Sequence, residues 1–339
     1  MSHRGRLLLA LAVLTAALLA VAALAVLVGS ARLRPGAVAE VLAGRADPAS
    51  TASVVILSLR LPRIAAAVLA GAALAVAGVG FQALTRNPLA EPSVLGVSSG
   101  AAFGVVIAQL VSTGGGVVAE AVRLTLFGFA GALLAGVAVY LIASIGGGLP
   151  VHTLLLAGVI VGIFFASATT VLTSLLDVNR LGGIVHWLLG NISPIAPAPL
   201  GVFAALAALG FGLIAGRARE LNLLALGEEA ALQLGVHAER LKIRIFVGSA
   251  LLTASVVAFA GPIGFVGLVV PHALRLVLGP DNRVLTPAAL VAGGAFLLAA
   301  DTLARNVVAP AELSVGVITS FCGAPVFVYL LRSRPRGSL

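Results

Sequence analysis

Long apolar runs dominate the pattern along the chain, and polar residues collect in the short segments between them. Ten runs are long enough to cross the roughly 30 Å hydrocarbon core of a bilayer as helices. They cover roughly residues 7–28, 62–84, 94–112, 122–144, 153–176, 197–216, 243–260, 263–279, 284–304 and 314–332. The pattern predicts an all-α, polytopic membrane protein with about ten transmembrane helices, formed by a single domain over residues 1–339.

The eighth run, 263–279, is the least regular, because Gly261, Pro262, Gly264 and Pro271 interrupt it. Breaks of this kind are tolerated at membrane depth only where the freed backbone groups face protein or a water-filled cavity. The run therefore predicts either an element that lines a cavity or a kink against neighbouring helices.

The basic residues predict the orientation of the chain in the membrane. An even number of spans places both termini on one side, and a cytoplasmic N-terminus puts 13 of the 21 Lys and Arg residues on the inner side. This bias favours cytoplasmic N- and C-termini. The basic start resembles a signal peptide, but the run that follows is too long for one, so we expect a retained first helix.

Two connections are longer than they need to be. Segment 29–61 on the outer side is long enough for a short surface helix. Segment 217–242 is the largest inner loop, and in it two carboxylates follow Gly227 and precede Gly235, which suits a helix N-terminus and C-terminus respectively. We therefore expect a cytoplasmic helix of about two turns over 228–234, which is too short to be stable without a partner to pack on.

Composition supports lipid as the solvent. Hydrophobic residues make up 60% of the chain and charged residues only 10%, with a mean hydropathy of +1.16. The 40 glycines predict close helix–helix packing. The net charge is +9, and the basic residues flank the predicted spans. We interpret them as an orientation signal and expect no nucleic-acid partner. A single cysteine, Cys322, excludes an internal disulfide and is expected to be a buried thiol.

No energy source is expected within the chain itself. The lone lysine, Lys242, follows no glycine-rich loop, so ATP binding by that route is not expected. The spans hold almost no ionisable groups; Asp177 and Asp301 fall near outer ends, and Asp301 precedes Arg305 by one turn, an i,i+4 pair. No histidines pair at metal-ligand spacing, and no catalytic residues are recognised. The chain is therefore a passive pore or one driven by another subunit, and the helix at 228–234 favours the second.

Several motifs then carry a family resemblance, beginning with RLPRIAAAVLAGAALAVAGVGFQALTRNPLAEPSVLGVSSG at 60–100. It continues through LNLLALGEEAALQLGV at 221–236, GPIGFVGLVVPHALRL at 261–276, LLAADTLARNVVAPAELSVGV at 297–317 and GAPVFVYLL at 323–331. In this order, over almost the whole chain, they resemble the permease family of type II ABC importers for ferric siderophores, haem and vitamin B12.

The resemblance implies a homodimer in a bacterial inner membrane, with the transport path between the two copies at roughly 153–176 and 314–332. Two ATP-binding-cassette ATPase subunits would use ATP and Mg, and a periplasmic binding protein would deliver the cargo. The chain itself would be no enzyme and would hold no cofactor. The expected cargo is an iron chelate, either haem or a ferric siderophore, with vitamin B12 as the alternative.

The resemblance also implies three groups of site residues. Arg60, Arg63 and Arg305 match arginines that meet glutamates of the binding protein, and interfacial snorkelling is the alternative. The coupling loop at about 217–242 would contact the ATPase through Gly227, Glu228, Glu229, Leu232, Leu234 and Gly235. The cytoplasmic gate would map onto Asn87, Leu89, Val151 and His152; here the chain departs from the vitamin B12 permease, which has two small hydroxyl residues at the positions of Val151 and His152.

Two other classes of function compete with this interpretation. An ion-coupled secondary transporter would need ionisable groups near the middle of the spans and would not need the helix at 228–234. A passive channel or a structural membrane subunit would not need arginines that dock a binding protein.

Overall fold

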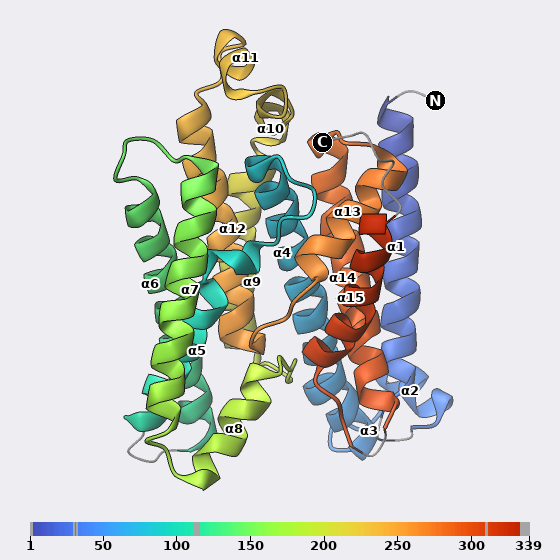
Figure 1. Cartoon of the computed structure of the whole chain (residues 1–339). Helices are drawn as coiled ribbons and strands as arrows, with labels where there is room; N and C mark the ends of the chain where they lie inside the picture. The colour runs from blue at the N-terminus through green and yellow to red at the C-terminus, as the bar shows by residue number, and fades with distance from the viewer. Residues whose placement is uncertain (1–2, 30, 32, 112–115, 309–310, 333–339) are drawn as a thin grey trace.

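The structure, a computed structural model, describes residues 3–29, 31, 33–111, 116–308 and 311–332. Every regular element in this part of the chain is a helix, and the long helices run side by side in one bundle (Figure 1). In order they are α1 (His3–Leu27), α2 (Pro35–Leu42), α3 (Thr51–Ser53), η1 (Val54–Arg60), α4 (Leu61–Thr85), η2 (Pro92–Leu95), α5 (Val97–Leu110), α6 (Val117–Ala143), α7 (Val151–Thr173), α8 (Val178–Leu188), α9 (Pro197–Ala215), α10 (Ala218–Leu224), α11 (Glu228–Gln233), α12 (Ala238–Ala260), α13 (Val266–Leu278), α14 (Asn282–Asn306) and α15 (Val315–Arg332).

Each of the ten expected spans contains an apolar helix. Within the described residues, seven helices are long and apolar enough to cross a membrane: Leu7–Leu27, Thr51–Thr85, Val118–Ala143, Val151–Thr173, Pro197–Ala215, Ala238–Ala260 and Asn282–Asn306. The other three expected spans hold the shorter apolar helices Val97–Leu110, Val266–Leu278 and Val315–Val328. The all-α membrane fold is confirmed, while ten crossings and the sidedness of the termini stay predictions.

Helix α4 forms the centre of the bundle and packs against α9, α12, α13 and α14. Glycines allow the closest of these approaches. A Cβ on Gly71 of α4 would collide with the carbonyl of Gly293 on α14, and one on Gly78 would collide with the carbonyl of Gly267 on α13. The small residues that the sequence analysis expected at helix contacts are therefore what brings the backbones together.

The break before α13 is a structured connection. Gly261 and Phe265 both have positive φ, at 70° and 68°, and the Phe265 amide donates to Glu91 Oε1 at 2.8 Å. Within α13, Pro271 supplies no N–H to the carbonyl of Gly267, and Gln82 Nε2 of α4 donates to that carbonyl at 3.4 Å instead. The freed backbone groups thus face protein, which is one of the two arrangements that the irregular sequence predicted.

The two ends of the bundle carry different short helices. Helices α10 and α11 project at the end where α1 begins, and α2, α3 and α8 lie at the opposite end (Figure 1). The surface helix expected in segment 29–61 is present as α2. The expectation of a buried thiol is wrong, because Cys322 of α15 is exposed in the described chain.

Candidate functional site

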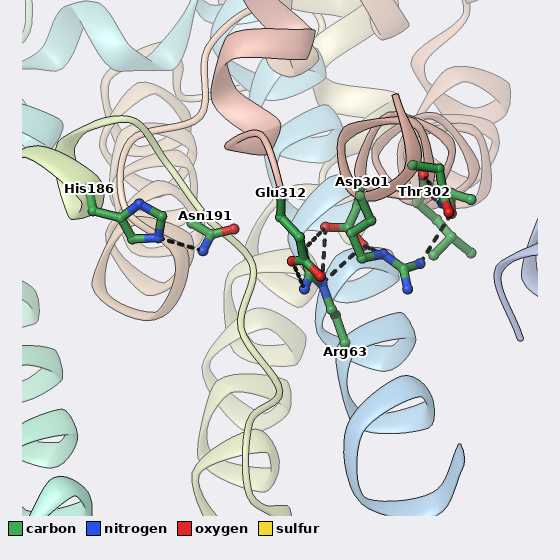
Figure 2. A network of polar contacts seen from close by, with 9 residues as sticks. Arg63, His186, Asn191, Asp301, Thr302 and Glu312 are labelled. Atoms are coloured by element: carbon green, nitrogen blue, oxygen red, sulfur yellow. Dashed lines mark hydrogen bonds and ion pairs between the residues drawn. The ribbon is translucent and has the colours of Figure 1, made fainter. Parts of the chain in front are cut away.

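A buried network of charged groups joins α4 to α14 at the end of the bundle that carries α2 and α8 (Figure 2). Arg63 Nη2 lies 2.9 Å from Asp301 Oδ1, and Arg63 Nε donates to both oxygens of that carboxylate at 3.2 Å. The Asp301 side chain is 0% exposed. A carboxylate this deep needs charged partners, because burying an unpaired charge is costly.

The same carboxylate also holds Arg305, one turn further along α14. Arg305 Nε lies 3.1 Å from Asp301 Oδ2, close enough for an ion pair but without the alignment of a hydrogen bond. This confirms the i,i+4 pair expected from the sequence. Asp301 therefore sits between two guanidinium groups from two different helices, so it works as the centre of the network.

Glu312 closes the network on its outer side. Its Oε2 accepts from Arg63 Nη1 at 2.8 Å, and its side chain is 36% exposed. Glu312 lies in the connection between α14 and α15 and so ties the start of α15 to α4. A second polar contact, between Asn191 Nδ2 and His186 Nε2 at 3.0 Å, lies apart from this network (Figure 2).

Arg60 is satisfied by backbone groups. Its guanidinium donates to the carbonyls of Val26, Leu27 and Ala31, at the end of α1 and just beyond it. Carbonyls in the last turn of a helix lack intrahelical partners and carry a partial negative charge, which a buried cation satisfies. Arg60 thus fixes the end of α1 against the wide π-helical turn η1.

Arg60, Arg63 and Arg305, which the resemblance assigned to docking, are all buried in the described chain. Their exposed fractions are 4%, 8% and 4%. The sequence placed them correctly at one end of the molecule, but it did not reveal that carboxylates and carbonyls of the same chain already occupy them. Their role in docking a binding protein stays a prediction.

At the other end, segment 217–242 folds into two short helices. The helix expected over 228–234 is α11, which spans Glu228–Gln233. Gly235 has φ of 82°, and its amide and that of Val236 donate to Leu232 O and Ala231 O at 2.9 Å each. This is the glycine-terminated helix end that the sequence predicted. Leu232 of α11 and Leu234, the residue just after it, are 60% and 58% exposed, so two apolar side chains face outward here.

Ion pairs hold α11 to the start of α12. Lys242 of α12 is 3% exposed and lies 3.2 Å from Glu228 Oε2, and it also pairs with Glu239 on its own helix. Glu239 Oε2 in turn accepts from the Leu149 amide at 2.6 Å, in the connection that leads into α7. One chain of contacts therefore runs from α11 through α12 to the start of α7.

Helix α10 is fixed to the start of α14 by amide and carboxylate groups. Asn222 Oδ1 accepts from the backbone N and side-chain Nδ2 of Asn282 at 2.8 and 2.9 Å, and Asn222 Nδ2 donates to Asp281 Oδ1 at 2.6 Å. Asp281 also caps α14 and binds Arg283 through both carboxylate oxygens. These hydrogen bonds from Arg283 hold the pKa of the Asp281 carboxyl well below its usual range.

The four residues assigned to the gate come from two connections. Asn87 is exposed after α4, where its Oδ1 accepts from the Leu89 amide at 3.0 Å. Val151 and His152 begin α7, and His152 is exposed. Both pairs lie at the end of the bundle that carries α10 and α11 (Figure 1). Their role as a gate stays a prediction.

Sequence reasoning missed Glu312, Glu239 and Asn222. The partners of Arg63 lie 238 and 249 residues away along the chain, so no local spacing relates them. The sequence did contain a signal for the ion pair between Lys242 and Glu239, because a lysine three residues after a glutamate lies on the same helix face.

Comparison with known proteins agrees with this architecture. Residues 15–333 match the model of the FecCD transport family. The chain is 44% identical over 287 residues to the cobalamin import system permease protein BtuC of Halobacterium salinarum, covering 84% of this chain and 75% of the relative. It is 41% identical over 290 residues to the hemin transport system permease protein HmuU of Yersinia pestis, covering 83% and 84%.

A solved inward-facing structure, assigned to the metal-chelate type of ABC transporter, superposes with a TM-score of 0.80 at 30% identity. The match covers 98% of this chain and 100% of that one. The described helices thus reproduce a transporter subunit over its full length. The chain belongs to the FecCD transport family and is a multi-pass permease of the type II ABC importers for iron chelates and vitamin B12.

Proposed function

We propose that the chain forms, as a homodimer in a bacterial inner membrane, the transport path of an ABC importer for an iron chelate. Two ATPase subunits on the cytoplasmic side hydrolyse ATP with Mg, and a periplasmic binding protein delivers the cargo. Ten spans place both termini in the cytoplasm. The observation that carries the proposal is α11, a six-residue helix that presents Leu232 and Leu234 outward while ion pairs anchor its base.

The contacts of α11 support its role in coupling. A helix this short gains little stability from itself, so the exposed leucines suit a groove on another subunit. The base of α11 connects through Lys242, Glu239 and Leu149 to the start of α7, where the proposed gate residues Val151 and His152 lie. Movement imposed on α11 would reach the gate through polar contacts that are already in place.

The experiment replaces the apolar face of α11. In the complex reconstituted with its ATPase and binding protein, Leu232→Asp with Leu234→Asp should remove binding-protein-stimulated ATP hydrolysis and transport, because a buried carboxylate opposes docking of the ATPase. Ile145→Asp is the matched control: Ile145 is 83% exposed in the connection between α6 and α7, outside the coupling loop, and we expect it to be neutral. Normal coupled transport by the double variant would refute the coupling role.

The relatives do not separate the cargoes, since identity is 44% to a cobalamin permease and 41% to a hemin permease. An iron chelate is proposed because relatives named for hemin, iron(3+)-hydroxamate and Fe(3+)-citrate span three kinds of iron compound, whereas the others named for a cargo share one, cobalamin. Transport of haem, a ferric hydroxamate and cobalamin by the same reconstituted complex decides between them. Uptake of cobalamin alone would replace the iron chelate with the alternative.

Docking of the binding protein is proposed to use the edge of the charged network at the outer end. Arg63 is the arginine whose ion-pair partner, Glu312, reaches the surface. A carboxylate of the binding protein could approach Arg63 there, whereas Asp301 shields Arg305 and backbone carbonyls occupy Arg60. Titrating the binding protein against folded Arg63→Gln at low and high salt tests this, because the substitution removes the charge and such contacts weaken with ionic strength. Unchanged affinity would remove Arg63 from the interface.

A further inference from the structure

An apolar hollow of about 240 Å³ opens on the surface of the bundle between α9 and α14. Both helices pack against α4 but hardly touch each other, and α4 and α12 contribute the deepest lining residues. Half of the lining is alanine, at positions 72, 73, 204, 207 and 208, so small side chains create the space. Ala204 and Ala208 are exposed, which places the opening on the outward face of α9.

The occupant of this hollow must itself be apolar. All ten lining residues are apolar, so no side chain there can donate or accept a hydrogen bond. The hollow is larger than a cavity of about 150 Å³ that stays dry and binds benzene. Its four helices, α4, α9, α12 and α14, are all among those long enough to cross a membrane, so the medium beside the opening is hydrocarbon. A lipid acyl chain fits both conditions.

A charge at one end of the hollow indicates the kind of lipid. On α14, Arg283, Pro287 and Leu290 form one outward stripe at i, i+4 and i+7, and Leu290 lines the hollow. At 1.5 Å per residue, Arg283 lies about 10 Å along the helix from Leu290. This puts the guanidinium of Arg283 where a bilayer changes from acyl chains to headgroups, so an N–H group that Asp281 leaves free can donate to a lipid phosphate there.

The contacts of Arg283 leave room for a phosphate. Its Nε and Nη2 bind Asp281, while Nη1 makes no hydrogen bond or ion pair within the described chain, and the side chain is 57% exposed. We propose that the hollow between α9 and α14 binds one acyl chain of an anionic phospholipid from the surrounding bilayer, whose phosphate is held by Arg283. This lipid site lies apart from the proposed transport path and from the coupling helix α11, and it does not bind the cargo.

The test compares two neighbouring alanines of α9. Ala204 lines the hollow, whereas Ala205 is exposed and does not. The protein is purified in detergent with phosphatidylglycerol or phosphatidylcholine, and bound lipid is counted by native mass spectrometry. We expect the wild type and Ala205→Trp to retain phosphatidylglycerol, Ala204→Trp to lose it, and Arg283→Gln to lose the preference for phosphatidylglycerol over phosphatidylcholine.

A second measurement needs no variant, so it stands if Ala204→Trp does not fold. Phosphatidylglycerol with a photoreactive diazirine on its acyl chain is crosslinked to the wild type, and adducts should map to the helices that line the hollow, α4, α9, α12 and α14. The site is overturned by equal retention of the two lipids in the wild type, by full retention in folded Ala204→Trp, or by adducts confined to other helices. Each readout is independent of transport, so the proposed function is tested separately.

Discussion

Asp301 contributes most to holding together the charged network of Arg63, Arg305 and Glu312. It is the fully buried member, and it pairs with two arginines that are themselves almost completely buried. Glu312 pairs with only one of them and remains partly exposed, so solvent already compensates part of its charge. The two carboxylates therefore differ in importance, although both contact Arg63.

Neutralising each carboxylate in turn measures this difference. Asp301→Asn leaves Arg305 buried without a counter-charge and Arg63 with Glu312 alone, and we expect it to lower the free energy of unfolding by about 3–5 kcal/mol. Glu312→Gln, which keeps a hydrogen-bond acceptor, should cost about 1 kcal/mol or less. Denaturant unfolding in detergent, followed by helical circular dichroism, gives both values; equal losses would mean that Asp301 is not the centre of the network.

Among the elements, the long apolar helices could be predicted from sequence, because a bilayer demands continuous hydrophobic length whatever the tertiary contacts are. α11 could also be located, since Glu228 and Gly235 mark its ends locally. Helices α8 and α10 were missed, because each is short and its burial depends on neighbours distant in sequence. The same limit applied to Arg63, whose partners Asp301 and Glu312 are known only once α4 and α14 are placed together.

The close contact between Gly71 and Gly293 leads to a prediction about how α4 packs against α14. Gly293→Ala puts a methyl group into the backbone of Gly71, and we expect a loss of about 1–3 kcal/mol as α4 and α14 are forced apart. Gly212→Ala in α9 is the control, because a Cβ there meets nothing within 4 Å and alanine is the better helix former. Thermal unfolding of the two variants should shift in opposite directions; a stable Gly293→Ala would argue against the close contact.

At the scale of the whole molecule, two surfaces with different proposed partners lie at opposite ends of the bundle. The α10–α11 end holds the elements proposed to meet the ATPase, and the α2–α8 end holds the network proposed to meet the binding protein (Figure 1). The structure places these ends opposite each other, and the arginine distribution predicts that the α10–α11 end faces the cytoplasm.

Sided labelling tests that assignment. In a Cys322→Ala background the chain has no other cysteine, so single cysteines report their own position. Gln233→Cys on α11 and Ala49→Cys after α2 are both exposed sites. We expect a membrane-impermeant maleimide to label Ala49→Cys in intact spheroplasts and Gln233→Cys only in inside-out vesicles. The reverse pattern would invert the proposed topology.

The burial of Lys242 also governs which reagents can detect this chain. It is the single lysine of the sequence, and two carboxylates enclose its amine at the base of α11. Reagents that acylate lysine side chains will find no accessible target in the folded protein. A lysine-directed crosslinking map of the assembled importer will therefore report contacts among its partners and leave α11 out, even where α11 is seated in them. Carboxylate-directed reagents, for which Glu229 is exposed, are the ones able to record that interface.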